Sequence, residues 1–319
     1  MSKILITGAA GFIGRALAQR LLEQGEDLVL VDSLNNYYSP QLKRDRVNTL
    51  MVGSKVKFFY ADITNADYLN RLFKENDINT VVHLAAQPGI TTSVVNPGKT
   101  FKNNVEGTAN VLDACARHGI KRIFLASSSS VYGSDMFNTI NAETDSPAPQ
   151  NNYAISKLTN EMQAKLHHTT YGGTMASMRF FTTYGPWGRP DMACWLFTEA
   201  MLNNRPIIIR GEQTRRDFVY IDDLVTMITS IMEHTPPDRL LTYNLGSGRS
   251  YRVVDMVNCI GSCLGIPPNF SFLELPDYEM TQTCADMIRY HNKIAALPNF
   301  KPLAEGVEEF VKWYKEYNK

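Results

Sequence analysis

The chain of 319 residues predicts an α/β fold: a doubly wound parallel sheet followed by a smaller, partly interleaved α/β lobe. Three observations support this prediction. Short apolar runs, typical of buried parallel strands, alternate with helical patterns through the first half of the chain. A glycine-rich segment directly follows the first of these runs. After residue 180, proline and glycine become frequent and the expected elements become shorter.

The glycine-rich segment predicts a dinucleotide site. Lys3–Ile6 is an apolar strand, and residues 7–14 read Thr-Gly-Ala-Ala-Gly-Phe-Ile-Gly before a helical pattern. Gly8 allows a tight turn, Gly11 lets the backbone approach a pyrophosphate, and Gly14 lets the helix pack on the strand. The order of strand, glycines and helix therefore indicates a Rossmann-type sheet.

The end of the second strand indicates which dinucleotide is bound. The apolar run Leu28–Val31 ends on Asp32, 24 residues after Gly8, where a carboxylate can accept hydrogen bonds from both ribose hydroxyls. The same carboxylate would repel a 2′-phosphate, and residues 33–36 contain neither arginine nor lysine. The sequence therefore predicts NAD rather than NADP.

The next elements continue the alternation. Strands are expected at 56–60, 80–84, 122–126 and 174–178, and helices at 65–74, 101–117 and 152–170. Ligands of such sheets bind at the carboxyl ends of the strands. Asp62 and Ile63 lie at one such end and suit an adenine edge. Ala85 and Ala86 lie at another, where they either leave room for a cofactor or form a tight turn.

The second half predicts a separate lobe. Helices are expected at 222–233, 253–264 and 304–317, and residues 242–245 are expected to return to the main sheet as a strand. We therefore expect an NAD-binding domain over residues 1–180, with a return segment at 218–248, and a substrate-binding lobe over 181–319.

The composition argues against several classes of partner. The 32 basic and 32 acidic residues balance, and no basic run offers a surface for nucleic acid. No apolar run approaches the roughly 18 residues of a membrane span, and the N-terminus does not read as a signal peptide. Five scattered cysteines form no Cys-x-x-Cys pair, which predicts reduced thiols, a cytoplasmic location and no metal site.

Two groups of polar residues predict the chemistry. Tyr153 and Lys157 are four apart on an expected helix, so they share one face. An ammonium group lowers the pKa of a nearby phenol from its usual value of about 10, which lets Tyr153 exchange a proton with a sugar or alcohol hydroxyl. Ser127–Ser130 follows the strand at 122–126, where a hydroxyl can hydrogen-bond the reacting oxygen or simply belong to a polar loop.

Together these motifs resemble the extended short-chain dehydrogenases/reductases, and among them the nucleotide-sugar epimerases. The resemblance covers nearly the whole chain. It rests on the glycine segment, Ser-Ser-Ser-Val-Tyr-Gly at 128–133, Tyr-x-x-x-Lys at 153–157, Arg-Phe-Phe-Thr at 179–182, Gly-Pro-Trp-Gly-Arg-Pro-Asp-Met at 185–192 and Arg-Asp-Phe-Val-Tyr-Ile-Asp-Asp at 216–223. The segment at 185–192 is most similar to UDP-glucuronate 4-epimerases.

The resemblance implies a set of residue roles. Tyr153 would take the proton of the sugar 4-hydroxyl, Ser128 would position that oxygen, and Lys157 would hold the nicotinamide ribose. The implied cofactor-binding residues are Gly8, Gly11, Phe12, Ile13, Gly14, Asp32, Asn35, Asp62, Ile63, Leu84, Ala85, Ala86, Asn104, Tyr153 and Lys157. The implied substrate-binding residues are Ser128, Ser129, Ser130, Thr182, Arg189 and, for the diphosphate, Arg216.

The implied reaction converts UDP-glucuronate to UDP-galacturonate through a 4-keto intermediate. That intermediate is a β-keto acid, so we expect Thr182, Ser129, Ser130 and Arg189 to hold its carboxylate against loss of carbon dioxide. The resemblance also implies a homodimer that pairs the helices near 101–117 and 153–170. By analogy alone, the product would supply activated sugars for a surface polysaccharide.

Other functions remain open. A neutral-sugar epimerase would need no carboxylate contact, and Arg189 could then pair with a protein acid. Decarboxylases and 4,6-dehydratases usually place acidic residues in the serine loop, which this chain lacks, and a cofactor-sensing protein would not need the triad. Two positions depart from the epimerase pattern: Thr91 stands where arginine is common, and residues 274–278 lack an arginine for the diphosphate. Arg210, Arg215 or Arg252 could compensate.

Overall fold

A seven-stranded parallel sheet forms the centre of the protein in the computed structural model, which describes residues 3–52, 56–134 and 140–319. Its strand order is β10-β6-β5-β4-β1-β2-β3, and every neighbouring pair is parallel. The strands are β1 (Lys3–Thr7), β2 (Leu28–Asp32), β3 (Lys57–Tyr60), β4 (Ile78–His83), β5 (Arg122–Ser128), β6 (Thr174–Phe180) and β10 (Leu240–Leu245). The predicted fold class is confirmed.

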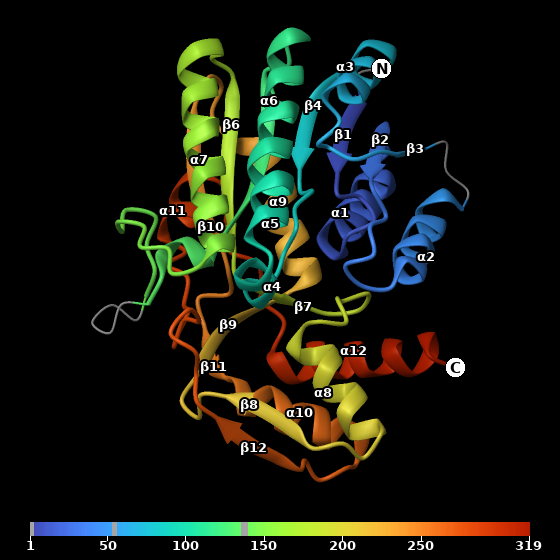
Figure 1. The fold of residues 1–319 in the computed structure, drawn as a ribbon, viewed down its shortest axis with the longest axis vertical. Helices are drawn as coiled ribbons and strands as arrows, with labels where there is room; N and C mark the ends of the chain where they lie inside the picture. The colour runs from blue at the N-terminus through green and yellow to red at the C-terminus, as the bar shows by residue number, and fades with distance from the viewer. Residues whose placement is uncertain (1–2, 53–55, 135–139) are drawn as a thin grey trace.

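Helices cover both faces of this sheet (Figure 1). They include α1 (Phe12–Glu23), α2 (Pro40–Met51), α3 (Ala66–Glu75), α6 (Gly107–Arg117), α7 (Asn152–Tyr171) and α9 (Ile221–His234). Ile4 and Ile6 of β1 pack into the core shared with α1 and α9, whereas Leu5 packs into the core shared with α3 and α6. Alternate side chains of one strand therefore enter two apolar layers, which is why residues 4–6 of β1 are apolar without alternation.

The chain reverses its direction across the sheet between β1 and β4. It moves outward from β1 to β2 and β3, then returns to the other side of β1 as β4. The turn after β1 is bound to both neighbours, because Gly8 N donates to Val31 O at 2.8 Å and Leu84 N donates to Thr7 O at 3.1 Å. In open α/β sheets the ligand crevice lies at this reversal, beyond the carboxyl ends of the strands.

A second set of elements lies against that edge (Figure 1). It contains a three-stranded sheet of β7 (Thr182–Tyr184), β9 (Arg215–Tyr220) and β11 (Ser250–Arg252), and a parallel pair of β8 (Ile207–Arg210) and β12 (Phe270–Leu273). Its helices are α8 (Ala193–Leu202), α10 (Val253–Leu264) and α12 (Leu303–Tyr317), whereas α11 (Ile288–Lys293) packs against β10 of the main sheet. Residues 242–245 return to the main sheet within β10, as expected. No helix in the described part of the chain is long and apolar enough to cross a membrane.

The helical structure observed around residues 101–117 differs from the single helix that the sequence predicted. After the short helix α4 (Ile90–Val95), helical structure begins earlier, with α5 (Pro97–Phe101), and passes through a π-helical turn, η1 (Lys102–Glu106), before α6. Proline is favoured at the first helical position, and the Asn96 side chain accepts a hydrogen bond from Lys99 N at 3.1 Å. The wider π turn carries Asn104 to the loop after β4, and such turns often occur at functional sites.

Candidate active site

One cavity joins the carboxyl edge of the main sheet to the second set of elements. The predicted residues that line it are Gly8, Gly11, Phe12, Ile13, Gly14, Asp32, Asn35, Asp62, Ile63, Leu84, Ala85, Ala86, Ser128, Ser129, Ser130, Tyr153, Lys157, Thr182, Arg189 and Arg216. Residues that are far apart in the sequence thus meet in one place. Asn104, also expected in the site, lies behind this lining.

The glycine turn fits the pyrophosphate of a dinucleotide. Gly8 has a φ of +72°, and a Cβ there would lie 2.7 Å from Ala85 N. A Cβ at Gly14 would lie 2.1 Å from Gly8 O, so the helix could not approach the turn this closely with any side chain. Helix α1 begins after Gly11 without a side-chain cap or an acidic residue in its first turn. Its first N–H groups are therefore suited to an anion.

Asp32 lies beside that turn in a more positive environment than expected. Its Oδ1 accepts a hydrogen bond from Leu34 N at 2.8 Å, and its Oδ2 accepts one from Ala10 N at 3.0 Å. Burial raises the pKa of Asp32, whereas these N–H groups and the charges of Lys43 and Arg46 lower it. Both cations come from α2, beyond residues 33–36 on which the sequence prediction was based.

Arg46 connects the two halves of the site. Its guanidinium is fully buried and donates to Ala10 O at 3.1 Å and to the Tyr38 hydroxyl at 2.5 Å. It also donates to Trp187 O at 2.6 Å and Gly188 O at 3.0 Å. The glycine turn and the loop that leads to Arg189 thus share one cation.

Lys43 supports the loop after β2, beside Asp32. Its Nζ donates to both Asn35 O and Asn35 Oδ1 at 2.7 Å, and it lies 4.5 Å from the centre of the Tyr38 ring. Burial lowers the pKa of Lys43 to about 8, although the carboxylate of Asp32 raises it. Lys43 is therefore a further cavity-lining cation that sequence reasoning missed.

Lys157 and Tyr153 lie one turn apart on α7, and both line the cavity. Lys157 is buried, and its Nζ donates to Ala126 O at the end of β5 at 2.9 Å. Burial lowers the pKa of Lys157 to about 8, while Glu161, one further turn along the helix, raises it.

The pKa of Tyr153 corrects one expectation. Burial raises this pKa, while the positive charge of Arg189 and a hydrogen bond with Ser128 lower it. The expected lowering by Lys157 is wrong for this structure, because burial of the phenol dominates and the groups that oppose it are Arg189 and Ser128.

A buried ion pair lies below Lys157. Glu161 Oε1 accepts hydrogen bonds from Ser127 Oγ at 2.5 Å and Arg179 Nε at 2.8 Å, and Glu161 Oε2 accepts one from Arg179 Nη2 at 2.8 Å. The Arg179 guanidinium also lies 4.7 Å from the centre of the Tyr132 ring. The carboxylate that raises the pKa of Lys157 is thus fixed in place from two sides.

The serine loop forms another wall of the cavity. Ser128, Ser129 and Ser130 are all buried where β5 passes into a short 3₁₀ turn. Ser128 Oγ donates to Ser130 Oγ at 3.1 Å and accepts from Ser130 N at 3.2 Å. Thr182, at the start of β7, also lines the cavity. Several hydroxyl groups therefore face the same space.

Arg189 is paired with a protein acid. Its Nε donates to Asp191 Oδ1 at 3.0 Å, and its Nη2 donates to Asp191 Oδ2 at 2.6 Å. This pairing uses the side edge of the planar guanidinium. The outer edge, formed by Nη1 and Nη2, is not used by Asp191 and can still bind a second planar anion.

Arg216 also lines the cavity, with an acidic neighbour. Glu279 lies 3.9 Å from Arg216 and 3.6 Å from Arg210. Arg215 donates to a backbone carbonyl and Arg252 pairs with a neighbouring aspartate, so both are held elsewhere. Among Arg210, Arg215 and Arg252, Arg210 is the one that shares the acidic neighbour of Arg216.

Asn104 shapes the lining from behind. Its side chain accepts from Gln87 N at 2.7 Å and donates to Gln87 O at 3.1 Å and Ser156 Oγ at 2.9 Å. It therefore fixes the loop that carries Ala85 and Ala86 against α7.

Comparisons with known proteins identify the family of the chain. Residues 4–246 match the NAD dependent epimerase/dehydratase family. The UDP-glucuronate 4-epimerase of Thermodesulfobacterium geofontis is 33% identical, over 99% of this chain and 97% of that protein. The crystal structure of UDP-glucuronic acid 4-epimerase from Bacillus cereus, with UDP-glucuronic acid and NAD, is 31% identical with a TM-score of 0.92 and 99% coverage of both chains. A Thermotoga maritima UDP-glucose 4-epimerase structure is 26% identical with a TM-score of 0.90, covering 99% of this chain and 100% of that one.

The chain therefore belongs to the NAD dependent epimerase/dehydratase family. It is an enzyme, and its cofactor is NAD, as the glycine turn and Asp32 predicted.

Proposed function

We propose that this enzyme inverts carbon 4 of a UDP-sugar, and that its substrate is UDP-glucuronate and its product UDP-galacturonate. The observation that carries the proposal is the position of Arg189. It lines the cavity close enough to Tyr153 for its charge to lower the phenol's pKa, and it keeps one guanidinium edge beyond Asp191. The similarity to proteins named UDP-glucuronate 4-epimerase supports the same substrate.

The residues of the cavity suit this reaction. NAD, when bound, supplies a hydride acceptor for carbon 4 and later the donor for its opposite face. Tyr153 accepts the proton of the 4-hydroxyl and returns it when the hydroxyl reforms. Ser128 donates a hydrogen bond to the same oxygen. The charge of Arg189 and a hydrogen bond with Ser128 favour the phenolate of Tyr153. Lys157, one helical turn away in the same cavity, would hold the nicotinamide ribose.

A hexuronate adds a requirement, because its 4-ketone is a β-keto acid. Such an acid loses carbon dioxide when the bond between carbons 5 and 6 aligns with the carbonyl π system. A guanidinium edge binds a carboxylate through two parallel hydrogen bonds and fixes its plane. Arg189, with the hydroxyls of Thr182, Ser129 and Ser130, would hold the carboxylate in an orientation that opposes cleavage.

A specific observation favours a second candidate, a neutral-sugar epimerase. Arg189 pairs with Asp191, and a neutral-sugar epimerase was expected to pair Arg189 with a protein acid in this way. The similarity to a UDP-glucose 4-epimerase structure fits this alternative. The two candidates differ in whether the outer edge of Arg189 contacts the sugar.

The test is to incubate purified enzyme with UDP-glucuronate, without added NAD, and to resolve the products by NMR. Formation of UDP-galacturonate to a near-even mixture supports the proposal and a retained cofactor, and Tyr153→Phe should abolish it. A pentose product would assign a decarboxylase instead. Conversion of UDP-glucose, but not of UDP-glucuronate, would favour the neutral-sugar enzyme.

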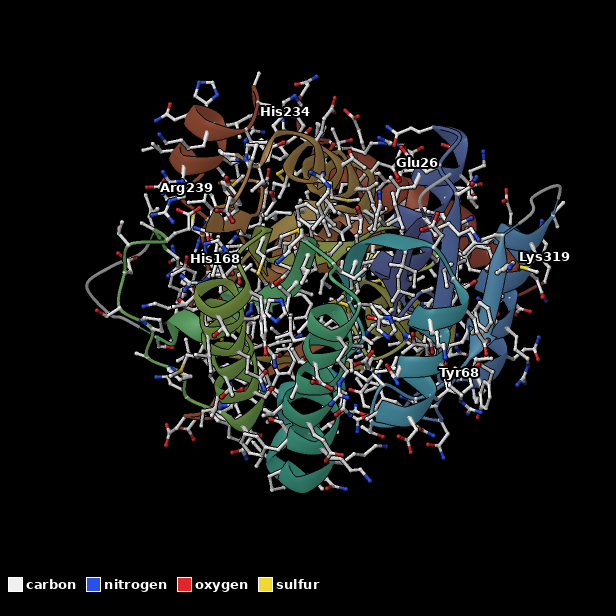
Figure 2. All side chains as sticks on the ribbon, turned by 90° about the horizontal axis from the view of Figure 1, so that it is seen from above. Glu26, Tyr68, His168, His234, Arg239 and Lys319 are labelled. Atoms are coloured by element: carbon white, nitrogen blue, oxygen red, sulfur yellow. The ribbon has the colours of Figure 1, made fainter. Side chains whose placement is uncertain are left out.

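We also infer a homodimer formed through α6 and α7, which lie side by side (Figures 1 and 2). Ile155, Met162 and Leu166 of α7 are 41%, 64% and 68% exposed, and their spacing places them on one helix face. Light scattering should give twice the chain mass, and Met162→Lys with Leu166→Lys should reduce it to the monomer. A wild-type monomer would refute the inference.

The division of the chain into an NAD-binding domain, 1–180 with its return segment 218–248, and a substrate lobe, 181–319, belongs to the same proposal. A role in supplying activated sugars within the cytoplasm belongs to it as well.

A further inference from the structure

A chain of hydrogen bonds supports Arg189 at the wall of the cavity. Thr92 Oγ1 donates to the Tyr37 hydroxyl at 3.3 Å, and the Tyr37 hydroxyl donates to Asp191 Oδ2 at 2.9 Å. Asp191 in turn accepts the two hydrogen bonds from Arg189. The members come from the loop after β2, from α4 and from the loop before α8, so three separate segments meet here.

We propose that Tyr37 and Asp191 are positioning residues that fix the direction of Arg189 and thereby decide how a substrate carboxylate is held. This inference rests on the proposed function, since it requires a sugar with a carboxylate. Arg189 and Tyr37 line the cavity, whereas Asp191 stands behind them. Asp191 therefore acts through Arg189.

The planar geometry explains why Asp191 matters. An arginine side chain has several rotatable bonds, so an unsupported guanidinium can present any of its edges. Asp191 occupies the edge formed by Nε and Nη2, which leaves the outer edge in one plane and one direction. A carboxylate on that edge is fixed in the same plane, and the bond between carbons 5 and 6 is fixed with it.

Tyr37 fixes Asp191 in turn. Oδ2 of Asp191 receives both the Tyr37 hydroxyl and Arg189 Nη2, so the carboxylate is held from two sides. Burial alone would raise the pKa of Asp191, but Arg189 and then Tyr37 lower it below its ordinary value, so the carboxylate stays ionised. The pair with Arg189 is therefore neutral before substrate binds.

The backbone leaves room for this arrangement at Gly89. Gly89 has a φ of +103°, and a Cβ there would lie 2.4 Å from the Tyr37 hydroxyl. Any larger residue would displace the hydroxyl from Asp191. The glycine that precedes α4 is thus part of the support for Arg189, although it lies in a different segment.

The 4-keto acid has an alternative fate, which is loss of carbon dioxide. In the 4-keto acid the bond between carbons 5 and 6 breaks, carbon dioxide leaves, and the electron pair forms the enolate of carbons 4 and 5. Carbon 5 then takes a proton from water, which gives a UDP-4-keto-pentose. A loosely held carboxylate samples the orientation that permits this step, and a fixed one does not.

The experiment compares wild type, Asp191→Asn and Tyr37→Phe with UDP-glucuronate as substrate, using NMR to measure the ratio of pentose products to UDP-galacturonate. We expect that ratio to rise about tenfold in Asp191→Asn, the effect of one hydrogen bond to a charged group, and about threefold in Tyr37→Phe. The NAD content of the purified variants should equal that of wild type, because neither residue contacts the glycine turn. Tyr60→Phe, at an exposed tyrosine, is the matched control.

The outcomes distinguish the positioning role of Tyr37 and Asp191 from the proposed function of the enzyme. Suppose that wild type converts UDP-glucuronate, and that both variants show the same product ratio and the same KM as wild type. The positioning role is then overturned and the proposed function stands. If wild type converts only neutral UDP-sugars, both fall together. Should Asp191→Asn fail to fold, as judged by its melting curve, Tyr37→Phe decides the question alone.

Discussion

Replacing Glu161 by glutamine should destabilise the protein by about 3–5 kcal/mol, the effect of removing one partner of a buried ion pair. The side chains of Arg179 and Glu161 are only 5% and 11% exposed. Their two hydrogen bonds, both 2.8 Å long, depend on both carboxylate oxygens. Glutamine keeps the volume but has one acceptor oxygen, so Arg179 would remain buried with its charge unpaired.

The assay is equilibrium unfolding in urea, monitored by circular dichroism, on protein freed of cofactor. In thermal unfolding of the same protein, the melting temperature should fall by about 5–7 °C, because a chain of this length has an unfolding entropy of about 0.7 kcal/mol/K. The double variant Glu161→Leu with Arg179→Met removes both charges together and should lose much less stability than the single change. A loss below about 1 kcal/mol in Glu161→Gln would refute the reasoning.

Three further predictions follow from single contacts. Burial lowers the pKa of Lys157 to about 8 from an ordinary 10.5, so the unfolded chain binds more protons between these values, and the stability of cofactor-free protein should rise with pH across that window. In Lys157→Met this rise should be lost, and urea unfolding from pH 7 to 10.5 measures it. Gly14→Ala places a Cβ 2.1 Å from Gly8 O and should lower the NAD content of purified protein, whereas Gly98→Ala, which meets nothing within 4 Å, should not. Asp217 accepts hydrogen bonds from three backbone N–H groups, so Asp217→Asn should cost about 2 kcal/mol in the same unfolding assay; an unchanged midpoint would contradict this.

The parts of the fold that could be predicted are those decided by neighbours in the chain. The apolar runs of β1 and β2 and the turn at Gly8 depend on local backbone and local hydrophobicity, and they occur where expected. Helix α10 has the expected bounds because its apolar period is regular from Val253 to Leu264. Residues 242–245 return to the main sheet within β10 as expected, in the same alternation of helix and strand that builds the rest of the sheet.

The parts that could not be predicted depend on contacts between distant segments. Helix α2 was not expected, because Lys43 and Arg46 occupy inward positions where an apolar residue would have marked the period. The available signal was Ser39 before Pro40, a cap and a first-turn proline. The partner of Arg189 could be named only as a protein acid, since adjacency to Asp191 in sequence does not specify which edge of a guanidinium is used.

The buried guanidinium of Arg46 limits how this enzyme can be divided or recombined. A fragment that ends near residue 180 would lose the carbonyl oxygens of Trp187 and Gly188 and keep a cation in the interior without them. In a chimaera whose residues after 180 come from a relative, the carbonyl oxygens at positions 187 and 188 would still have to accept hydrogen bonds from Arg46 of α2. The unit that can be exchanged between relatives therefore includes residues 40–51 together with the loop at 185–192, and its borders do not follow the proposed division at residue 180.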